Sequence, residues 1–260
     1  MENKNAFEVR NLSFAYGEKQ IVKNLSFDVP RGKVVTLMGA NGCGKSTLFQ
    51  LLTKNLTPGA GSIRMNGEEI SRIGLKSFAQ QAAIVHQYNT APSDITVEQL
   101  VAYGRTPFYR FGQGRRTEED ERMIERALRI TRVDAFRDRA VHQLSGGQKQ
   151  RVWIAMALAQ GTRTLLLDEP TTYLDVRYQI QLLRLIRALN QKYRTTILMV
   201  LHDINQAVSY SDEIIALSPK GELVAQGEPR SIINEANLKK MYRIDLETKD
   251  WDGRRFVLTV

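Results

Sequence analysis

The chain has 260 residues, 42% of them hydrophobic, which suits one large domain, or a domain with a subdomain, around a buried core. A single cysteine, Cys43, excludes an internal disulfide and fits a reducing compartment. The net charge of +9 favours anionic partners, but the basic residues are scattered, so a surface near anionic lipid is favoured over nucleic-acid binding. No apolar run is long enough to span a bilayer, and the polar N-terminus is unlike a signal peptide.

Residues 6–38 predict short β-strands separated by turns. Residues 7–9 and 25–29 alternate apolar and polar side chains, as half-buried strands do. Residues 33–38 are mostly apolar and rich in β-branched side chains, which predicts a fully buried strand. A helix is expected to follow over residues 45–54.

Residues 39–46 fit the pattern G-x-x-x-x-G-K-[ST] between this expected strand and helix. Glycines let backbone N–H groups surround phosphate oxygens with no Cβ in the way, and the start of the helix favours the same anion. Lys45 then supplies a charge for the β- and γ-phosphates, and Ser46 supplies a hydroxyl for Mg²⁺. The pattern therefore predicts a site for a nucleotide and Mg²⁺.

The middle of the chain changes in character. Thr96 is expected to cap a helix, with Gln99 three residues later, and residues 118–132 are charged and helix-prone. These features predict a helical subdomain inserted between β-rich segments.

Strands and helices alternate in the last third of the chain, which predicts a parallel sheet. The expected elements are a strand over 163–168, a helix over about 177–192, a strand over 195–201, a helix over about 203–210 and a hairpin over 213–227.

Four polar residues follow expected strands. Asp168 and Glu169 lie at the edge where open parallel sheets bind ligands, so Asp168 is expected to hold Mg²⁺ and Glu169 to polarise an attacking water. Gln87 could hold Mg²⁺ or that water, and His202 could contact the γ-phosphate and orient Glu169. Taken alone, Gln87 and His202 are more typical of solvated or structural side chains.

Two further features stay open on their own. Tyr16 could stack on a purine base or could simply pack against the protein. Residues 144–148, Leu-Ser-Gly-Gly-Gln, begin an expected helix with Ser145 as its N-cap and two glycines that expose backbone N–H groups. This segment is either a second anion-binding helix start or a plain capped helix.

In their order along nearly the whole chain, these motifs resemble those of the ATP-binding subunits of ABC transporters. The resemblance makes Tyr16 the A-loop aromatic, residues 39–46 the Walker A motif, Gln87 the Q-loop, residues 144–148 the signature motif, residues 164–168 Walker B, Glu169 the catalytic glutamate, Asp175 part of the D-loop and His202 the switch histidine.

The resemblance implies an α/β P-loop NTPase (RecA-like) core with a mostly parallel sheet, an antiparallel β subdomain and an inserted α-helical subdomain. It implies a single ABC ATPase domain over 1–260, with the β subdomain and nucleotide-binding core at about 1–90 and 150–230, the helical subdomain at about 91–149 and a C-terminal extension at about 231–260.

The resemblance also implies that two subunits form a head-to-tail homodimer and share each ATP. One subunit would bind ATP through Tyr16, Gly39, Asn41, Gly42, Cys43, Gly44, Lys45, Ser46 and Thr47, and the other through Ser145, Gly146, Gly147, Gln148 and Asp175. Mg²⁺ would lie on Ser46, Gln87 and Asp168, and catalysis would use Glu169, His202, Gln87 and Lys45.

Residues 101–107, 169–177 and 201–205 resemble the ATPases of importers for ferric siderophores, haem and cobalamin. This implies an iron-chelate importer ATPase, peripheral at the cytoplasmic face of the membrane, with permease subunits, an external binding protein and no nucleic-acid partner. A haem or cobalamin importer stays open. A soluble ABC ATPase acting on ribosomes or DNA is less favoured, because the chain has one Walker A motif and no long coiled coil.

Overall fold

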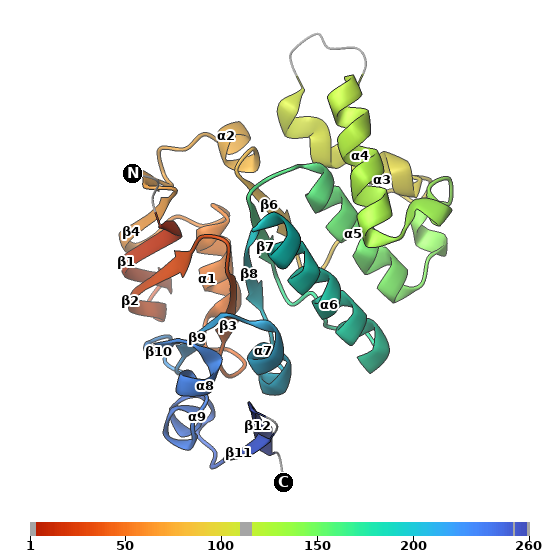
Figure 1. Ribbon diagram of the computed structural model, residues 1–260. Helices are drawn as coiled ribbons and strands as arrows, with labels where there is room; N and C mark the ends of the chain where they lie inside the picture. The colour runs from red at the N-terminus through yellow and green to blue at the C-terminus, as the bar shows by residue number, and fades with distance from the viewer. Residues whose placement is uncertain (1–3, 110–115, 252, 259–260) are drawn as a thin grey trace. The chain divides into compact units, whose positions relative to one another are not determined.

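The computed structural model describes residues 4–109, 116–251 and 253–258. They form two compact units (Figure 1). The first unit comprises Met1–Ile73 and Asn190–Val260, and the second comprises Gly74–Leu189. Residues 110–115 of the predicted helical subdomain lie outside the described residues.

The first unit contains an antiparallel sheet with strand order β2-β1-β4-β5. Its strands are β1 (Asn5–Tyr16), β2 (Lys19–Pro30), β4 (Ala60–Met65) and β5 (Glu68–Glu69). The predicted strands separated by turns are confirmed, but the predicted short length is wrong for β1 and β2, which are each 12 residues long. Register shifts interrupt their pairing at several points, so the alternation of apolar and polar side chains breaks and only fragments of it are visible in the sequence.

A second group of strands in the first unit surrounds β3 (Val34–Met38). β3 pairs in parallel with β8 (Thr196–Val200) and with β9 (Glu213–Leu217), while β10 (Leu223–Gly227) pairs antiparallel with β9. Every residue of β3 and β8 is buried, as in strands covered on both faces. The expected mostly parallel arrangement is confirmed.

The remaining elements of the first unit are the helices α1 (Lys45–Leu52), α7 (Ile204–Tyr210), α8 (Pro229–Ile232) and α9 (Glu235–Tyr242), and the hairpin strands β11 (Glu247–Trp251) and β12 (Arg254–Leu258).

The second unit has one parallel pair of strands, β6 (Ala82–Val85) and β7 (Thr164–Leu167). Its helices are α2 (Leu75–Ala79), α3 (Val97–Ala102), α4 (Glu118–Thr131), α5 (Gly146–Ala159) and α6 (Val176–Tyr193), with 3₁₀ helices η1 (Tyr103–Phe108), η2 (Asp134–Phe136) and η3 (Val141–Gln143). The last residues of α6 belong to the first unit. In the part of the chain that the structure describes, no helix combines the length and the apolar character needed to cross a membrane.

Helices α3, α4 and α5 gather around one apolar core (Figure 1). The core forms because the apolar faces of these helices are buried against one another. Side-chain caps fix where α3 and α4 begin. Thr96 Oγ1 accepts from Gln99 N at 3.3 Å, and Thr117 Oγ1 accepts from Asp120 N at 3.2 Å. The predicted cap at Thr96 is confirmed, and so is the predicted helix over 118–132.

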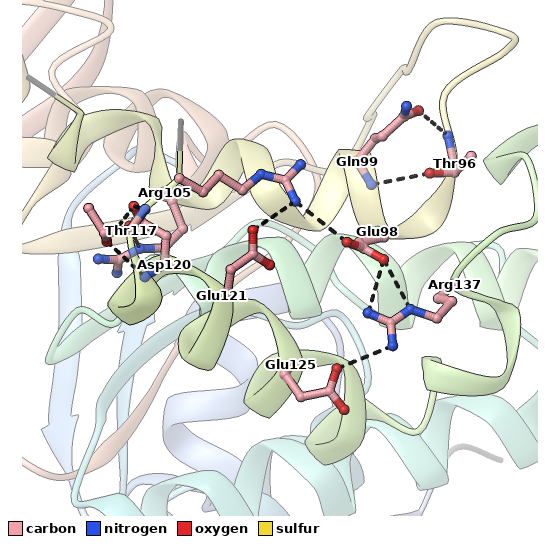
Figure 2. A network of polar contacts seen from close by, with 10 residues as sticks. Thr96, Glu98, Gln99, Arg105, Thr117, Asp120, Glu121, Glu125 and Arg137 are labelled. Carbon is pink, nitrogen blue, oxygen red and sulfur yellow. Dashed lines mark hydrogen bonds and ion pairs between the residues drawn. The ribbon is translucent and has the colours of Figure 1, made fainter. Parts of the chain in front are cut away.

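A polar network on the surface of this helical group joins α3 to α4 (Figure 2). The guanidinium of Arg137 lies 2.9 Å from Glu98 Oε2 at the start of α3 and 3.4 Å from Glu125 Oε2 in α4. Arg116 adds a second ion pair to Glu98 at 3.5 Å. These side chains are partly exposed, so the network contributes little stability pair by pair.

A buried ion pair lies beneath this surface network. The side chain of Arg105 is 7% exposed and that of Asp120 is 4% exposed. Arg105 Nε donates to Asp120 Oδ1 at 2.8 Å, and Arg105 Nη1 donates to the carbonyl of Ala159 at 3.1 Å at the end of α5. Arg105 therefore ties η1, α4 and α5 together.

We expect Arg105→Ala to lower the free energy of unfolding by about 3–5 kcal/mol, because the Asp120 carboxylate stays buried without its charged partner. Urea unfolding followed by circular dichroism measures this. Arg122→Ala is the matched control, because it breaks an exposed pair with Glu119 and should cost at most about 1 kcal/mol. Equal losses in the two variants would contradict a special role for the buried pair.

The pair of Arg105 and Asp120 also makes the free energy of unfolding sensitive to acid. Burial alone raises the pKa of Asp120, but the hydrogen bonds from Arg105 and Thr117 outweigh it and hold the pKa below its ordinary value of 3.8. The resulting stabilisation is present above that ordinary value and is lost as pH falls through the lower pKa of the folded state. Unfolding free energy should therefore fall more steeply on acidification in the unsubstituted chain than in Asp120→Asn.

Candidate functional site

The loop between β3 and α1 surrounds the ammonium group of Lys45. The residue is 5% exposed, and its Nζ donates to the carbonyl of Gly39 at 2.8 Å and to that of Ala40 at 3.0 Å. Asn41, Gly42 and Ser46 are exposed on this loop. The loop thus holds a cation inside while polar groups face solvent.

Two glycines give the loop its curvature. Gly42 has φ 77° and Gly44 has φ 97°, in the left-handed region that favours glycine. A Cβ on Gly44 would lie 3.0 Å from Ile21 Cγ2, whereas nothing lies within 4 Å of a Cβ built on Gly42. This open, glycine-lined turn at a helix start, with a lysine beside it, fits the phosphates of a nucleotide.

Cys43, unlike Asn41, Gly42 and Ser46, is not exposed on this loop. Its side chain is buried, and burial raises the pKa of the thiol. Its backbone N–H donates to the carbonyl of Ala40 at 3.3 Å. Thr47, the next predicted ligand after Ser46, is half-buried in the first turn of α1.

His202 follows β8, just as the loop follows β3, so both lie after the carboxyl ends of neighbouring strands. β3 and β8 are parallel neighbours, and Leu201 N donates to Leu37 O at 3.4 Å. His202 is exposed, and Asp203 after it caps α7 by accepting from Gln206 N at 2.8 Å. Within the first unit, His202 thus follows the strand that pairs with β3, the strand before the phosphate loop.

Tyr16 ends β1 and is 50% exposed. Its hydroxyl donates to Gln50 Oε1 of α1 at 3.4 Å, and its ring meets Phe14 edge-on. The ring is thus held next to the helix that starts at Lys45, with half of its surface free for stacking.

Helix α7, which follows His202, is held by two hydrogen bonds to strand β12. Asn205 Nδ2 donates to the carbonyl of Val257 at 3.2 Å, and the N–H of Val257 donates to Asn205 Oδ1 at 2.8 Å. This reciprocal pair joins the hairpin strand β12 to the helix that follows His202.

In the second unit, the segments after β6 and β7 place Gln87 next to Glu169. Asp168 N donates to Val85 O at 2.9 Å, which aligns the two strand ends. Gln87 Nε2 then donates to Glu169 Oε2 at 2.6 Å. Thr172 Oγ1 donates to the same carboxylate oxygen at 3.1 Å. Gln87 and Glu169 are therefore in contact where the two strands end, and Asp168 precedes Glu169 in the chain.

Sequence reasoning missed Thr172 and two tyrosines beside this pair. Tyr88 and Tyr173 share a hydrogen bond of 2.7 Å between their hydroxyls. The sequence signal that could have identified Thr172 is its hydroxyl, three residues after Glu169 in a turn. Tyr88 and Tyr173 lie 85 residues apart and belong to no repeating pattern, so nothing in the sequence pairs them.

The start of α5 forms a capping box. Ser145 N donates to Gln148 Oε1 at 3.0 Å, and Gln148 N donates to Ser145 Oγ at 3.4 Å. Ser145 and Gly146 are exposed, whereas Gly147 is buried. A Cβ on Gly147 would lie 2.7 Å from the ring of Tyr178 in α6, so only glycine fits there without a shift.

Asp175 caps the neighbouring helix α6, because its Oδ1 accepts from Tyr178 N at 3.0 Å. Asp175 is exposed and Leu174 before it lies beside Gly146, 3.9 Å from a Cβ built there. The predicted signature motif and D-loop residues are therefore neighbours on the second unit.

Each unit thus supplies a different set of candidate site residues. The first provides an anion-binding loop with a lysine, an aromatic ring and a histidine. The second provides a carboxylate with an amide and a hydroxyl on it, and an exposed capped helix start.

Comparisons with known proteins agree with these features. The ABC transporter family matches residues 22–172. The chain is 44% identical to the iron(3+)-hydroxamate import ATP-binding protein FhuC of Bacillus subtilis (strain 168), covering 94% of this chain and 90% of that protein. It is 45% identical to the achromobactin transport ATP-binding protein CbrD of Dickeya dadantii (strain 3937), covering 92% and 88%.

A solved structure of a metal-chelate type ABC transporter in an inward-facing conformation resembles the chain with a TM-score of 0.83 and 28% identity. The match covers 97% of this chain and 96% of that one. The phosphate loop, the Gln87–Glu169 pair and the capped signature helix now have one common explanation. The chain belongs to the ABC transporter family and is one of its ATP-binding ATPase subunits.

Proposed function

We propose that this chain hydrolyses Mg²⁺-bound ATP to power the import of an iron chelate. The observation that carries the catalytic part is the 2.6 Å contact between Gln87 and Glu169 at the carboxyl ends of two parallel strands. In this resting arrangement the carboxylate lies where parallel sheets bind ligands. Glu169 acts as the general base that orients and polarises the attacking water.

The other residues bind and orient the triphosphate. Backbone N–H groups of the loop and the charge of Lys45 hold its phosphates, and Tyr16 stacks on the base. His202 contacts the γ-phosphate. When bound, Mg²⁺ neutralises charge on the phosphates, and Ser46, Gln87 and Asp168 supply the oxygen ligands that this ion prefers.

The exposed start of α5 supports a head-to-tail homodimer. Ser145 and Gly146 offer a helix N-terminus with its partial positive charge to solvent, and Asp175 lies on the same exposed surface. In the dimer these groups, with Gly147 and Gln148, complete the ATP site of the second copy. Hydrolysis then separates the two copies.

The proposed cargo is supported by the relatives, which are named as an iron(3+)-hydroxamate import ATP-binding protein and an achromobactin transport ATP-binding protein and which the chain matches along most of their length. We place the dimer at the cytoplasmic face of the cell membrane, on two permease subunits served by an external binding protein. The scattered positive charge of +9 suits a surface near anionic lipid.

Uptake of radioactive iron tests this function. In a strain that lacks the gene for this chain, we expect uptake of one ferric hydroxamate, catecholate or citrate chelate to be lost and to return with the unsubstituted gene. Glu169→Gln should not restore it, and the matched control Glu68→Gln, at an exposed position in β5, should.

Cobalamin and haem belong in the same panel. Loss of cobalamin or haem uptake with normal iron-chelate uptake would replace the proposed cargo while leaving the ATPase assignment intact. Normal uptake of every compound would contradict the importer proposal.

A further inference from the structure

Two consecutive residues after β6 contact the turn that follows β7. Gln87 Nε2 donates to Glu169 Oε2 at 2.6 Å. The hydroxyl of Tyr88 lies 2.7 Å from the hydroxyl of Tyr173, and their ring centroids are 6.0 Å apart. The segment after β6 therefore contacts the turn at two points, one on the carboxylate and one near the end of the turn.

The turn itself has a constrained backbone. Glu169 has φ 47° and Tyr173 has φ 64°, both in the left-handed region, which costs free energy for residues other than glycine. Thr172 supports the turn by donating its hydroxyl to Glu169 Oε2 at 3.1 Å and its N–H to Glu169 O at 3.2 Å. A turn of this kind keeps its shape only while surrounding contacts hold it.

Tyr88 and Tyr173 are suited to a contact that forms and breaks. Tyr88 is 70% exposed and Tyr173 is 77% exposed, so neither ring is fixed in a core. The contact between them is one hydrogen bond of 2.7 Å between the two hydroxyls. It can therefore break without any change in a packed core.

We propose that Tyr88 and Tyr173, the tyrosine pair, are positioning residues that join the segment after β6 to the turn after β7 and so keep Gln87 on Glu169. The inference rests on the proposed role of Glu169 as general base. While the tyrosine pair is bonded, Glu169 Oε2 accepts from Gln87 and Thr172. When either segment moves, the pair separates and Gln87 can leave the carboxylate.

While Gln87 donates to Glu169, its side chain is not available to Mg²⁺, where the proposed function uses it. The tyrosine pair therefore restrains hydrolysis until a partner moves one of its segments. Removing one hydroxyl should shift the resting population toward the separated state by about two- to tenfold, the range that one hydrogen bond supports. ATP hydrolysis without cargo should rise by that factor. Stimulation by cargo-loaded binding protein should shrink correspondingly, because the restraint that it releases is already absent.

The test uses the complete transporter in lipid vesicles, with permease and binding protein. The variants are Tyr88→Phe, Tyr173→Phe, the double substitution, and Tyr103→Phe as a matched control at a tyrosine that is 57% exposed in η1. ATP hydrolysis is measured with and without cargo-loaded binding protein, and thermal melting checks that each variant folds.

Without cargo, both single variants should hydrolyse ATP about two- to tenfold faster than the unsubstituted transporter, the range expected for loss of one hydrogen bond. The double variant should match either single one, because each change removes the same bond. Tyr103→Phe should leave both rates unchanged. Single variants with unchanged stimulation, or effects that add in the double variant, would overturn the inference.

Glu169→Gln in the same vesicles separates the two claims. If Glu169→Gln hydrolyses ATP normally, the proposed function of Glu169 fails. If Glu169→Gln is inactive while the tyrosine variants behave like the unsubstituted transporter, only the inference about the tyrosine pair fails.

Discussion

Glu169→Gln should lower the rate of ATP hydrolysis by about 10²–10⁴-fold, the contribution typical of a positioned general base. The amide oxygen of the new side chain can still accept the hydrogen bonds that Gln87 and Thr172 donate to Glu169 Oε2. The local structure should therefore persist, and only the ability to take a proton from water is lost. ATP affinity should stay within a few-fold of its original value.

Single-turnover hydrolysis and equilibrium ATP binding measure the two quantities separately. Because the variant binds ATP without consuming it, size-exclusion chromatography with ATP should show a larger dimer fraction than for the unsubstituted chain. Glu68→Gln, which changes an exposed glutamate in β5, is the control for loss of one negative charge. A near-normal rate in Glu169→Gln would refute the assignment of the base.

Lys45→Met should weaken ATP binding by about 30-fold or more, since truncating one partner of a buried charge pair costs about 2–5 kcal/mol. The methionine keeps most of the aliphatic stem, which is buried, but removes the ammonium group. It also removes the hydrogen bonds to the carbonyls of Gly39 and Ala40. Isothermal titration calorimetry with ATP and Mg²⁺ gives the affinity directly.

A thermal melting series provides the control for folding. Ligand that binds only the folded state raises the melting temperature with increasing concentration. The unsubstituted chain and Lys19→Met, at an exposed position in β2, should show this rise with ATP. Lys45→Met should melt cooperatively without it. An equal rise in Lys45→Met would exclude Lys45 as a phosphate ligand.

Local signals in the sequence predicted much of the fold. The expected helix over 177–192 is α6 (Val176–Tyr193), because its ends are set by nearby residues such as the cap Asp175. The expected hairpin over 213–227 is β9 and β10. These elements depend on side chains only a few positions apart, which a single sequence displays.

Contacts between distant residues were not visible in the same way. In the sequence Arg105 is an ordinary basic residue two positions before Pro107, yet its partners are Asp120 and the carbonyl of Ala159. Its burial depends on three segments meeting, and composition does not show that. The contact between Tyr88 and Tyr173 likewise depends on segments that meet only in the fold.

In the candidate site, too, local motifs were predictable and contacts between distant residues were not. Motif spacing predicted the phosphate loop and the positions of Gln87 and Glu169 after strands. It did not predict their contact, which arises because strand ends in a parallel pair lie together. Motif spacing did not predict that Thr172 donates to the same carboxylate, nor that Gly147 faces the ring of Tyr178. Those contacts depend on turn and helix geometry that the motifs do not encode.

The reciprocal bonds between Asn205 and Val257 have a consequence for biosynthesis. The two residues are 52 positions apart, so a ribosome must add β12 before the amide of Asn205 can find both of its partners. A nascent chain that stops before β12 can already contain the phosphate loop, while helix α7 after His202 is still unanchored. The histidine end of the site therefore becomes fully ordered only late in translation.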